Sequence, residues 1–489
     1  MITDRTAPPT AAYPPANFFP GAPSSSRALK NIHWWIYAYF FLLIFEGAFR
    51  KWIFYTTPAI SNLFLVVRDP VAVIIYFLVW RAGLWPKQVY MYLLYIFLGI
   101  FMAVGIYQII SIPGMTVQIA IYGIRSYCLH LPLVFVLPAV MNEDDVLKIG
   151  KWIIKMAPWM TMLMVMQFIA PADHFLNRSG AEGGTQIESA LNKIRMAGTF
   201  SYNTGAAKFY LLATAFFVYS YIRKNWLSSR WRIITAAAIL MVIPLSGSRA
   251  LMLSFAITMG FTLVGAIFNP RLSSVIARIS LVFAVVIGLL VLSPTFQEGV
   301  DVFKTRWEQG LGATGQFSDA ITNRFFGDFS AAFDVTSEVP NLGYGLGIGS
   351  NVAAKLKTGD LGFLLAEAEW PRTILEMGAA LGFSWLLFRC AIAFFVARHA
   401  WIALRSKKTL AWLLLSTCMI DMISAPMEQS TSLGFIVFSA GLTLAALNPS
   451  PSSEPFMPPL WWIEKYCSPM QVGQDEPLDG NPEIRDDDI

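Results

Sequence analysis

One short stretch, Ser246-Gly247-Ser248-Arg249, combines residue types that bind an anion. It separates two apolar runs, near 233–245 and 250–268, whose lengths approach the ~20 residues that a membrane helix needs. An arginine at such a junction is costly to place beside lipid and marks a functional site by default. Gly247 permits a tight turn, and the serine hydroxyls can cap the following helix. The stretch indicates an anion site at a membrane surface; the alternative is an interfacial arginine that snorkels to water.

The composition places these residues in a membrane protein. Of 489 residues, 56% are hydrophobic and only 14% are charged, whereas about a quarter are charged in a soluble domain. The 37 Phe and 16 Trp fit lipid contact and aromatic belts. A net charge of +5 is too small to indicate nucleic-acid binding. Four cysteines without paired spacing indicate neither a disulfide framework nor a zinc site, so we expect no metal and no cofactor.

Twelve apolar runs predict an all-α polytopic membrane protein with about twelve transmembrane helices. The runs lie near 33–49, 59–80, 89–110, 117–140, 152–170, 203–222, 233–245, 250–268, 275–293, 373–397, 409–424 and 433–447. Loops on one side are rich in Lys and Arg, whereas the short loops near 111–116 and 425–432 have none. The basic loops and both termini are therefore predicted to be cytoplasmic.

This orientation divides the chain into five parts. A disordered cytoplasmic tail is expected at 1–30, the first nine spans at 31–293, and a large outer loop at 294–371. Spans ten to twelve follow at 372–447, and a second cytoplasmic tail at 448–489. Within the outer loop, an aromatic and charged stretch at 303–308 predicts an amphipathic helix on the membrane surface.

Basic residues nevertheless gather on the predicted outer side, against the charge bias of the loops. Because the planar guanidinium group matches phosphate oxygens, they predict a diphosphate-binding site. Its candidate residues are Arg50, Lys51, Arg68, Arg195, Arg249, Arg324 and Arg372, and Arg125 and Arg306 lie on the same side. For Arg50 and Arg68 the alternative is an ion pair within the protein, since Glu46 precedes Arg50 by four residues and Asp69 follows Arg68.

Two carboxylates stand at the mouth of the tenth span, in Glu367-Ala368-Glu369-Trp370. A carboxylate at membrane level can act as a general base, and we predict Glu369 in that role, with Glu367 as the alternate. A hydrated helix start is the competing interpretation, because acids and proline favour the first turn. The glycine-rich segment 343–349 has spacing like that of a phosphate loop, but no predicted strand precedes it, so a nucleotide site is not expected.

The chain resembles the O-antigen ligase/polymerase superfamily of bacterial envelope polysaccharide assembly over about 195–385 and in its twelve-span plan. The segments that carry the resemblance are Arg195-Met196-Ala197-Gly198-Thr199-Phe200 with Asn203, Ser246-Gly247-Ser248-Arg249, Gly343-Tyr344-Gly345-Leu346-Gly347, and Leu375-Glu376-Met377-Gly378. Glu46-Gly47-Ala48-Phe49-Arg50-Lys51-Trp52 and Arg68-Asp69-Pro70 resemble a subgroup of predicted polymerases. The ligases show His-Asn nine residues before Glu-x-Gly, where this chain has Glu367 and Ala368. The ligase histidine therefore cannot be carried over, which favours the polymerase branch.

The resemblance implies a metal-independent membrane glycosyltransferase on the periplasmic side of the bacterial inner membrane. Its substrate would be a saccharide linked to a polyprenyl diphosphate such as undecaprenyl diphosphate, and its product a cell-surface polysaccharide built from repeat units. Arginines would stabilise the departing diphosphate and a carboxylate would accept the hydroxyl proton; the ring of Trp370 could stack on a sugar. Membrane lipid and other polysaccharide assembly proteins are the expected partners.

Four alternatives stay open: an O-antigen-type ligase, a lipid-linked saccharide transporter or flippase, a metal-dependent glycosyltransferase and a non-catalytic assembly partner. Transporters often have internal repeats, whereas the large loop between spans nine and ten prevents a division into two halves. A metal-dependent enzyme would need acids in the first outer loop, which instead has Arg50 and Lys51.

Overall fold

The computed structural model describes residues 26–180, 186–312, 327–359, 362 and 364–449. In these ranges the chain is helical, and the only pairing of extended backbone is a bridge between Glu188 and Ile194. Seven helices are long and apolar enough to cross a membrane, or eight if one bent pair counts as a span. The prediction of an all-α, multi-pass membrane protein is confirmed at this level.

The long apolar helices follow the predicted runs. They are α1 (Ser26–Ala48) with the π-helical turn after it, α2 (Pro58–Leu63) with α3 (Arg68–Arg81), α4 (Val89–Ser111), α7 (Glu143–Ile169), α10 (Arg249–Phe268), α11 (Pro270–Leu290) and α16 (Ala379–Arg405). The first helix begins at Ser26, inside the predicted tail 1–30. The rest of that tail, and 450–489 of the C-terminal one, lie outside the described residues.

The remaining predicted spans are helical but short or broken. The run at 117–140 forms α5 (Val117–Ile124), a π-helical turn and α6 (Leu133–Val140), which are bent by 40°. The others are α8 (Asn203–Ser220), α9 (Ser229–Leu245), α17 (Leu410–Leu415) with α18 (Met419–Ser424), and α19 (Ser430–Ala445). All residues of α19 except Thr431 are buried, as are most residues of α8, so these two helices fill the centre of the bundle.

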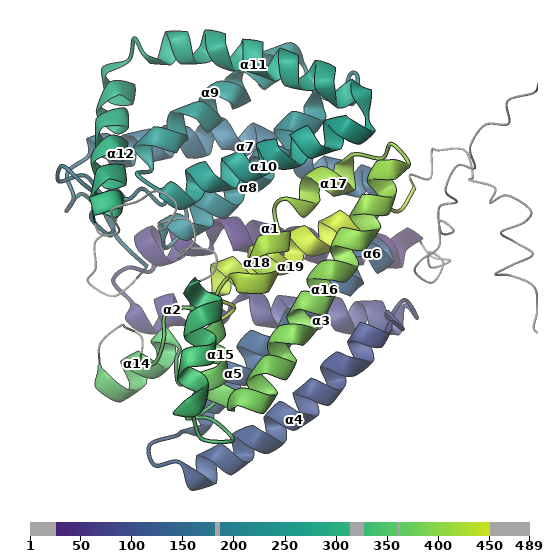
Figure 1. The fold of residues 1–489 in the computed structure, drawn as a ribbon, viewed down its shortest axis with the longest axis vertical. Helices are drawn as coiled ribbons and strands as arrows, with labels where there is room; N and C mark the ends of the chain where they lie inside the picture. The colour runs from purple at the N-terminus through teal and green to yellow at the C-terminus, as the bar shows by residue number, and fades with distance from the viewer. Residues whose placement is uncertain (1–25, 181–185, 313–326, 360–361, 363, 450–489) are drawn as a thin grey trace, which may run out of the picture.

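The helices lie in a bundle whose left end in Figure 1 carries α12 (Pro294–Gly312), α14 (Asn351–Thr358) and α2. Helix α12 runs across the ends of α9 and α11 and packs on α9. It includes the stretch predicted to lie on the membrane surface. We call this end of the bundle the α12 end; it is the end predicted to face outward.

A break separates the expected loop from the span after it. The run predicted to start at 373 forms two helices, α15 (Glu369–Met377) and α16, with Gly378 between them at φ +82°. A Cβ at Gly378 would lie 2.0 Å from the carbonyl oxygen of Asn341, so glycine is required both by the backbone angle and by the close approach. The break holds α15 as a separate buried helix.

Candidate functional site

Three arginines from distant parts of the chain gather at the α12 end. Arg249 is the first residue of α10, Arg195 follows a turn in the segment before α8, and Arg306 lies on α12. Each is partly buried. Burial and the positive charges of Arg306 and Arg249 lower the pKa of Arg195 from its usual value, so the three groups are within electrostatic reach of one another. We call them the arginine cluster.

A tight turn places Arg195 beside the start of α10. The backbone N–H of Arg195 donates to Ile187 (2.8 Å), and that of Ser189 donates to Lys193 (2.6 Å). Gly247 takes a positive φ of +54°, and a Cβ there would lie 2.5 Å from the hydroxyl of Ser189. The turn at 187–195 therefore packs directly on the Gly247 turn.

The adjoining contacts fix the other two arginines. Ser248 caps α10 by accepting a hydrogen bond from the backbone N–H of Leu251 (3.3 Å). An ion pair of 2.8 Å between Lys193 and Glu298 joins the 187–195 turn to α12. The N-terminal end of α10 adds the positive end of a helix dipole to the same place.

The arginine cluster has donors without acceptors. Within the described part of the chain, no hydrogen bond or ion pair joins the three guanidinium groups to a carboxylate. The Nε atoms of Arg195 and Arg306 and the hydroxyl of Ser189 are buried without a hydrogen-bond partner there. Buried donors are normally satisfied, and three like charges repel, so this arrangement is suited to an anionic group with several oxygens.

Arg50 and Lys51 instead hold the segment before α8 in place. Arg50 donates to the carbonyl oxygens of Ser61 (3.1 Å) and Gly180 (2.6 Å) and to the Ser201 hydroxyl (3.1 Å). Lys51 is fully buried and donates to the carbonyl oxygen of Gly198 (2.6 Å). Both positively charged groups thus donate mainly to backbone carbonyl oxygens, and they anchor this segment.

Arg68 lies in a second buried group of charges. Its Nε donates to Glu46 at 2.9 Å, while its two Nη atoms have no partner in the described chain. Asp69 pairs with Arg125 and with His130, at 3.0 Å to the latter. Internal pairing therefore occurs here, but Glu46 pairs with Arg68 rather than with Arg50, and Asp69 pairs with Arg125 rather than with its neighbour.

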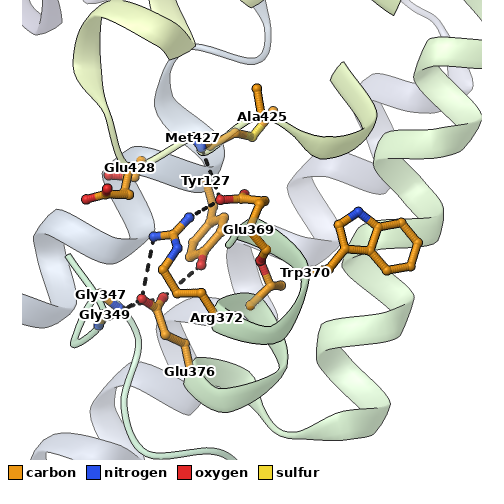
Figure 2. Close-up of polar contacts among 12 residues, drawn as sticks. Tyr127, Gly347, Gly349, Glu369, Trp370, Arg372, Glu376, Ala425, Met427 and Glu428 are labelled. Carbon is orange, nitrogen blue, oxygen red and sulfur yellow. Dashed lines mark hydrogen bonds and ion pairs between the residues drawn. The ribbon is translucent and has the colours of Figure 1, made fainter. Parts of the chain in front are cut away.

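Glu369 lies at the centre of a buried ion network (Figure 2). One carboxylate oxygen binds Arg372 and also accepts the backbone N–H of Met427 (3.2 Å). The other oxygen binds Arg389, whose remaining donors reach the carbonyl oxygens of Met422 and Ala425. Guanidinium groups thus bind both carboxylate oxygens, and Glu369 joins α15, α16 and the segment after α18. This geometry gives no support to a general-base role for Glu369.

Glu376, seven residues further along α15, accepts the glycine-rich loop. The backbone N–H groups of Gly347 and Gly349 each donate to its carboxylate at 3.0 Å, and the hydroxyl of Tyr127 donates at 2.7 Å (Figure 2). Gly347 has a φ of +81° and lies against the backbone of α5. The loop whose spacing is like that of a phosphate-binding loop thus binds a carboxylate of its own chain.

The two other residues of the predicted acid cluster differ in exposure. Glu367 is exposed, and no hydrogen bond or ion pair joins it to another described residue. Trp370 is buried, donates from its indole N–H to the carbonyl oxygen of Ile423 (3.0 Å) and packs edge-on against Phe329. The ring therefore packs inside the protein, and its stacking on a sugar stays a prediction.

Glu428 is a buried carboxylate that the sequence did not single out. Its Oε2 accepts only a long bond of 3.4 Å from the backbone N–H of Asn351, and its Oε1 has no partner in the described chain. Burial raises the pKa of Glu428, which Arg372 opposes. Figure 2 shows its carboxylate apart from the ion network around Glu369.

Comparisons with known proteins identify no relative. No family model, curated protein or solved structure matches the chain. The site must therefore be interpreted from its own residues. Among the described residues, no three His, Cys, Asp or Glu side chains lie together as a metal site.

The structure brings together only part of the predicted site. Arg195 and Arg249 lie in one cluster, whereas Arg50, Lys51, Arg68 and Arg372 are engaged elsewhere, and Arg324 lies outside the described residues. Arg306 was noted only as one of the basic residues of the outer loop. Its place on the amphipathic stretch 303–308 was the available signal, since such a helix can fold back onto the bundle.

Proposed function

We propose that this protein transfers a glycosyl group from a polyprenyl-diphosphate-linked saccharide, at the periplasmic face of a bacterial inner membrane, and thereby polymerises cell-surface polysaccharide repeat units. The observation that supports the proposal is the arginine cluster: Arg195, Arg249 and Arg306 lie together without carboxylate partners in the described chain, at the N-terminus of a helix that can span a membrane. A lipid-linked diphosphate has its charge at that level and its prenyl chain in the bilayer.

The proposed topology has twelve spans, with both termini cytoplasmic and 294–371 periplasmic. Short helices such as α8 and α19 are surrounded by other helices, so they need not match the bilayer thickness themselves. The resemblance of short motifs in 195–385 to the O-antigen ligase/polymerase superfamily also supports the proposal, because Arg195 and Arg249 both belong to the resembling segments.

The chemistry needs little from the protein beyond charge and proton transfer. A sugar hydroxyl attacks the anomeric carbon, the bond from that carbon to the phosphate oxygen breaks, and the lipid diphosphate leaves with its negative charge. The cluster stabilises this charge as it develops. Since the donor already contains the energy-rich bond, no nucleotide and no metal enter the proposed reaction.

The saccharides that accumulate in a strain lacking this protein distinguish the candidate functions. A polymerase predicts single repeat units linked to the lipid carrier and exposed to the periplasm. Full-length chains on the carrier would instead indicate an O-antigen-type ligase, and single units confined to the cytoplasmic leaflet a transporter or flippase. Unchanged lipid-linked saccharides would contradict the proposal.

A further inference from the structure

An ion pair between Lys208 and Asp421 joins α8 to α18 inside the bundle. The two side chains are 17% and 18% exposed, so the pair is reachable, unlike the network around Glu369, whose side chains are at most 1% exposed. Ionisable residues within apolar helices are costly and are therefore functional candidates. Nothing in the proposed function so far uses this pair.

A hydrogen bond between helices indicates where the pair lies along the bundle. The hydroxyls of Thr258 on α10 and Ser416 after α17 are 3.2 Å apart. Thr258 is nine residues from Arg249, about 14 Å along the helix. Beyond Ser416 the chain passes through Asp421 to Glu428, which accepts the backbone N–H of Asn351 at the start of α14 (3.4 Å), so it runs toward the α12 end (Figure 1). The carboxylate therefore lies between the level of Thr258 and the α12 end, which carries the arginine cluster.

Three buried acids of the bundle have no oxygen available. Glu369 is held by two guanidinium groups, Glu376 by Arg372 and three hydrogen-bond donors, and Glu46 by Arg68. A fourth, Glu428, keeps an oxygen without a partner in the described chain, but it is only 4% exposed and is therefore less reachable than Asp421. In Asp421, Oδ1 is paired with Lys208, while no described residue donates a hydrogen bond to Oδ2. The ammonium group of Lys208 fixes the orientation of the carboxylate.

We propose that Asp421 is the proton acceptor for the acceptor-sugar hydroxyl, an inference that rests on the proposed glycosyl transfer. The hydroxyl oxygen bonds to the anomeric carbon as the bond from that carbon to the phosphate oxygen breaks. The hydroxyl proton moves to Oδ2 of Asp421, and the lipid diphosphate leaves with the bonding electron pair and its charge stabilised by Arg249 and its neighbours. Lys208 is the positioning residue of this pair.

The test must separate catalysis from support of the fold, because removing one partner leaves an unpaired charge inside the bundle. The double variant Lys208→Met/Asp421→Asn removes both charges and keeps the side-chain shapes. With purified protein and a polyprenyl-diphosphate-linked saccharide, we expect its turnover to fall about 10²- to 10⁴-fold, the usual contribution of a general base. Its affinity for the donor and its thermal midpoint should stay near those of the wild type.

Two further variants sharpen the result. Lys208→Met alone keeps the carboxylate and should be at least about tenfold more active than the double variant. Arg223→Met/Asp144→Asn removes a partly exposed ion pair at the opposite end of the bundle and should act like the wild type. If the turnover of the Lys208→Met/Asp421→Asn protein lies within a few-fold of the wild type, the role proposed for Asp421 is wrong, while the proposed function is unaffected. A folded wild type that transfers no sugar overturns the proposed function itself.

Discussion

Replacing Glu369 by glutamine separates the two roles considered for this residue. A general base predicts a folded protein whose turnover is about 10²- to 10⁴-fold lower. The structure predicts a loss of stability instead, because the substitution removes the shared partner of Arg372 and Arg389, whose side chains are at most 1% exposed. Removing one partner of a buried ion pair costs about 3–5 kcal/mol, a large share of the ~5–15 kcal/mol by which folded proteins are stable.

Thermal unfolding of the purified protein in detergent measures this loss, and Glu367→Gln is the matched control. Glu367 is exposed and two residues away, so its replacement should change the free energy of unfolding by no more than about 0.5 kcal/mol. The double variant Glu369→Gln/Arg389→Met should lose less stability than the sum of the two single variants, with a coupling of about 0.5–3 kcal/mol. If Glu369→Gln melts with the wild type and is inactive, the anchor role is wrong and the base role stands.

Three further predictions concern the charges and the topology. Arg249→Ala should weaken binding of a polyprenyl diphosphate at least about tenfold, and Arg249→Lys should restore it only in part, because an ammonium group lacks the bidentate fork of a guanidinium. The control is Arg230→Ala, at an exposed position. Equal affinities of the two alanine variants in a lipid-binding assay would remove Arg249 from the site. The raised pKa of Glu428 favours its protonated form in the folded state, so its contribution to stability is present at low pH and is lost as pH rises through the folded pKa. Glu428→Gln should therefore melt above the wild type at neutral pH, with a difference that shrinks on acidification, and a variant that melts lower at every pH would contradict this sign. A cysteine introduced at the exposed Glu308 of α12 should react with a membrane-impermeant maleimide from the periplasm, whereas labelling only after the inner membrane is permeabilised would reverse the topology.

The helices were predictable because their signal is local. Runs of apolar residues predicted every helix that is long and apolar enough to cross a membrane. The Ser246-Gly247-Ser248-Arg249 stretch contains the capped start of α10. The break between α5 and α6 was missed, although Arg125, His130 and Pro132 interrupt the apolar run that was taken as one span.

The partners of the charges were not predictable, because they depend on contacts between distant segments. Arg389 meets Glu369 across 20 residues, and Arg50 meets Gly180 across 130. The glycine-rich loop illustrates the same point, since its N–H groups can bind any anion and the chain supplies Glu376. Sequence spacing indicated the chemistry of the loop but not which anion it binds.

Transfer by the purified protein tests the central claim most directly. The wild type, reconstituted in liposomes with a lipid-linked repeat unit and no nucleotide or added metal, should produce longer lipid-linked chains and release polyprenyl diphosphate. Arg195→Ala and Arg249→Ala proteins of wild-type thermal midpoint should produce neither. Chain growth that persists in both variants, or a folded wild type that binds the donor and never lengthens it, would contradict the proposal that the arginine cluster is the diphosphate site of a glycosyl transferase.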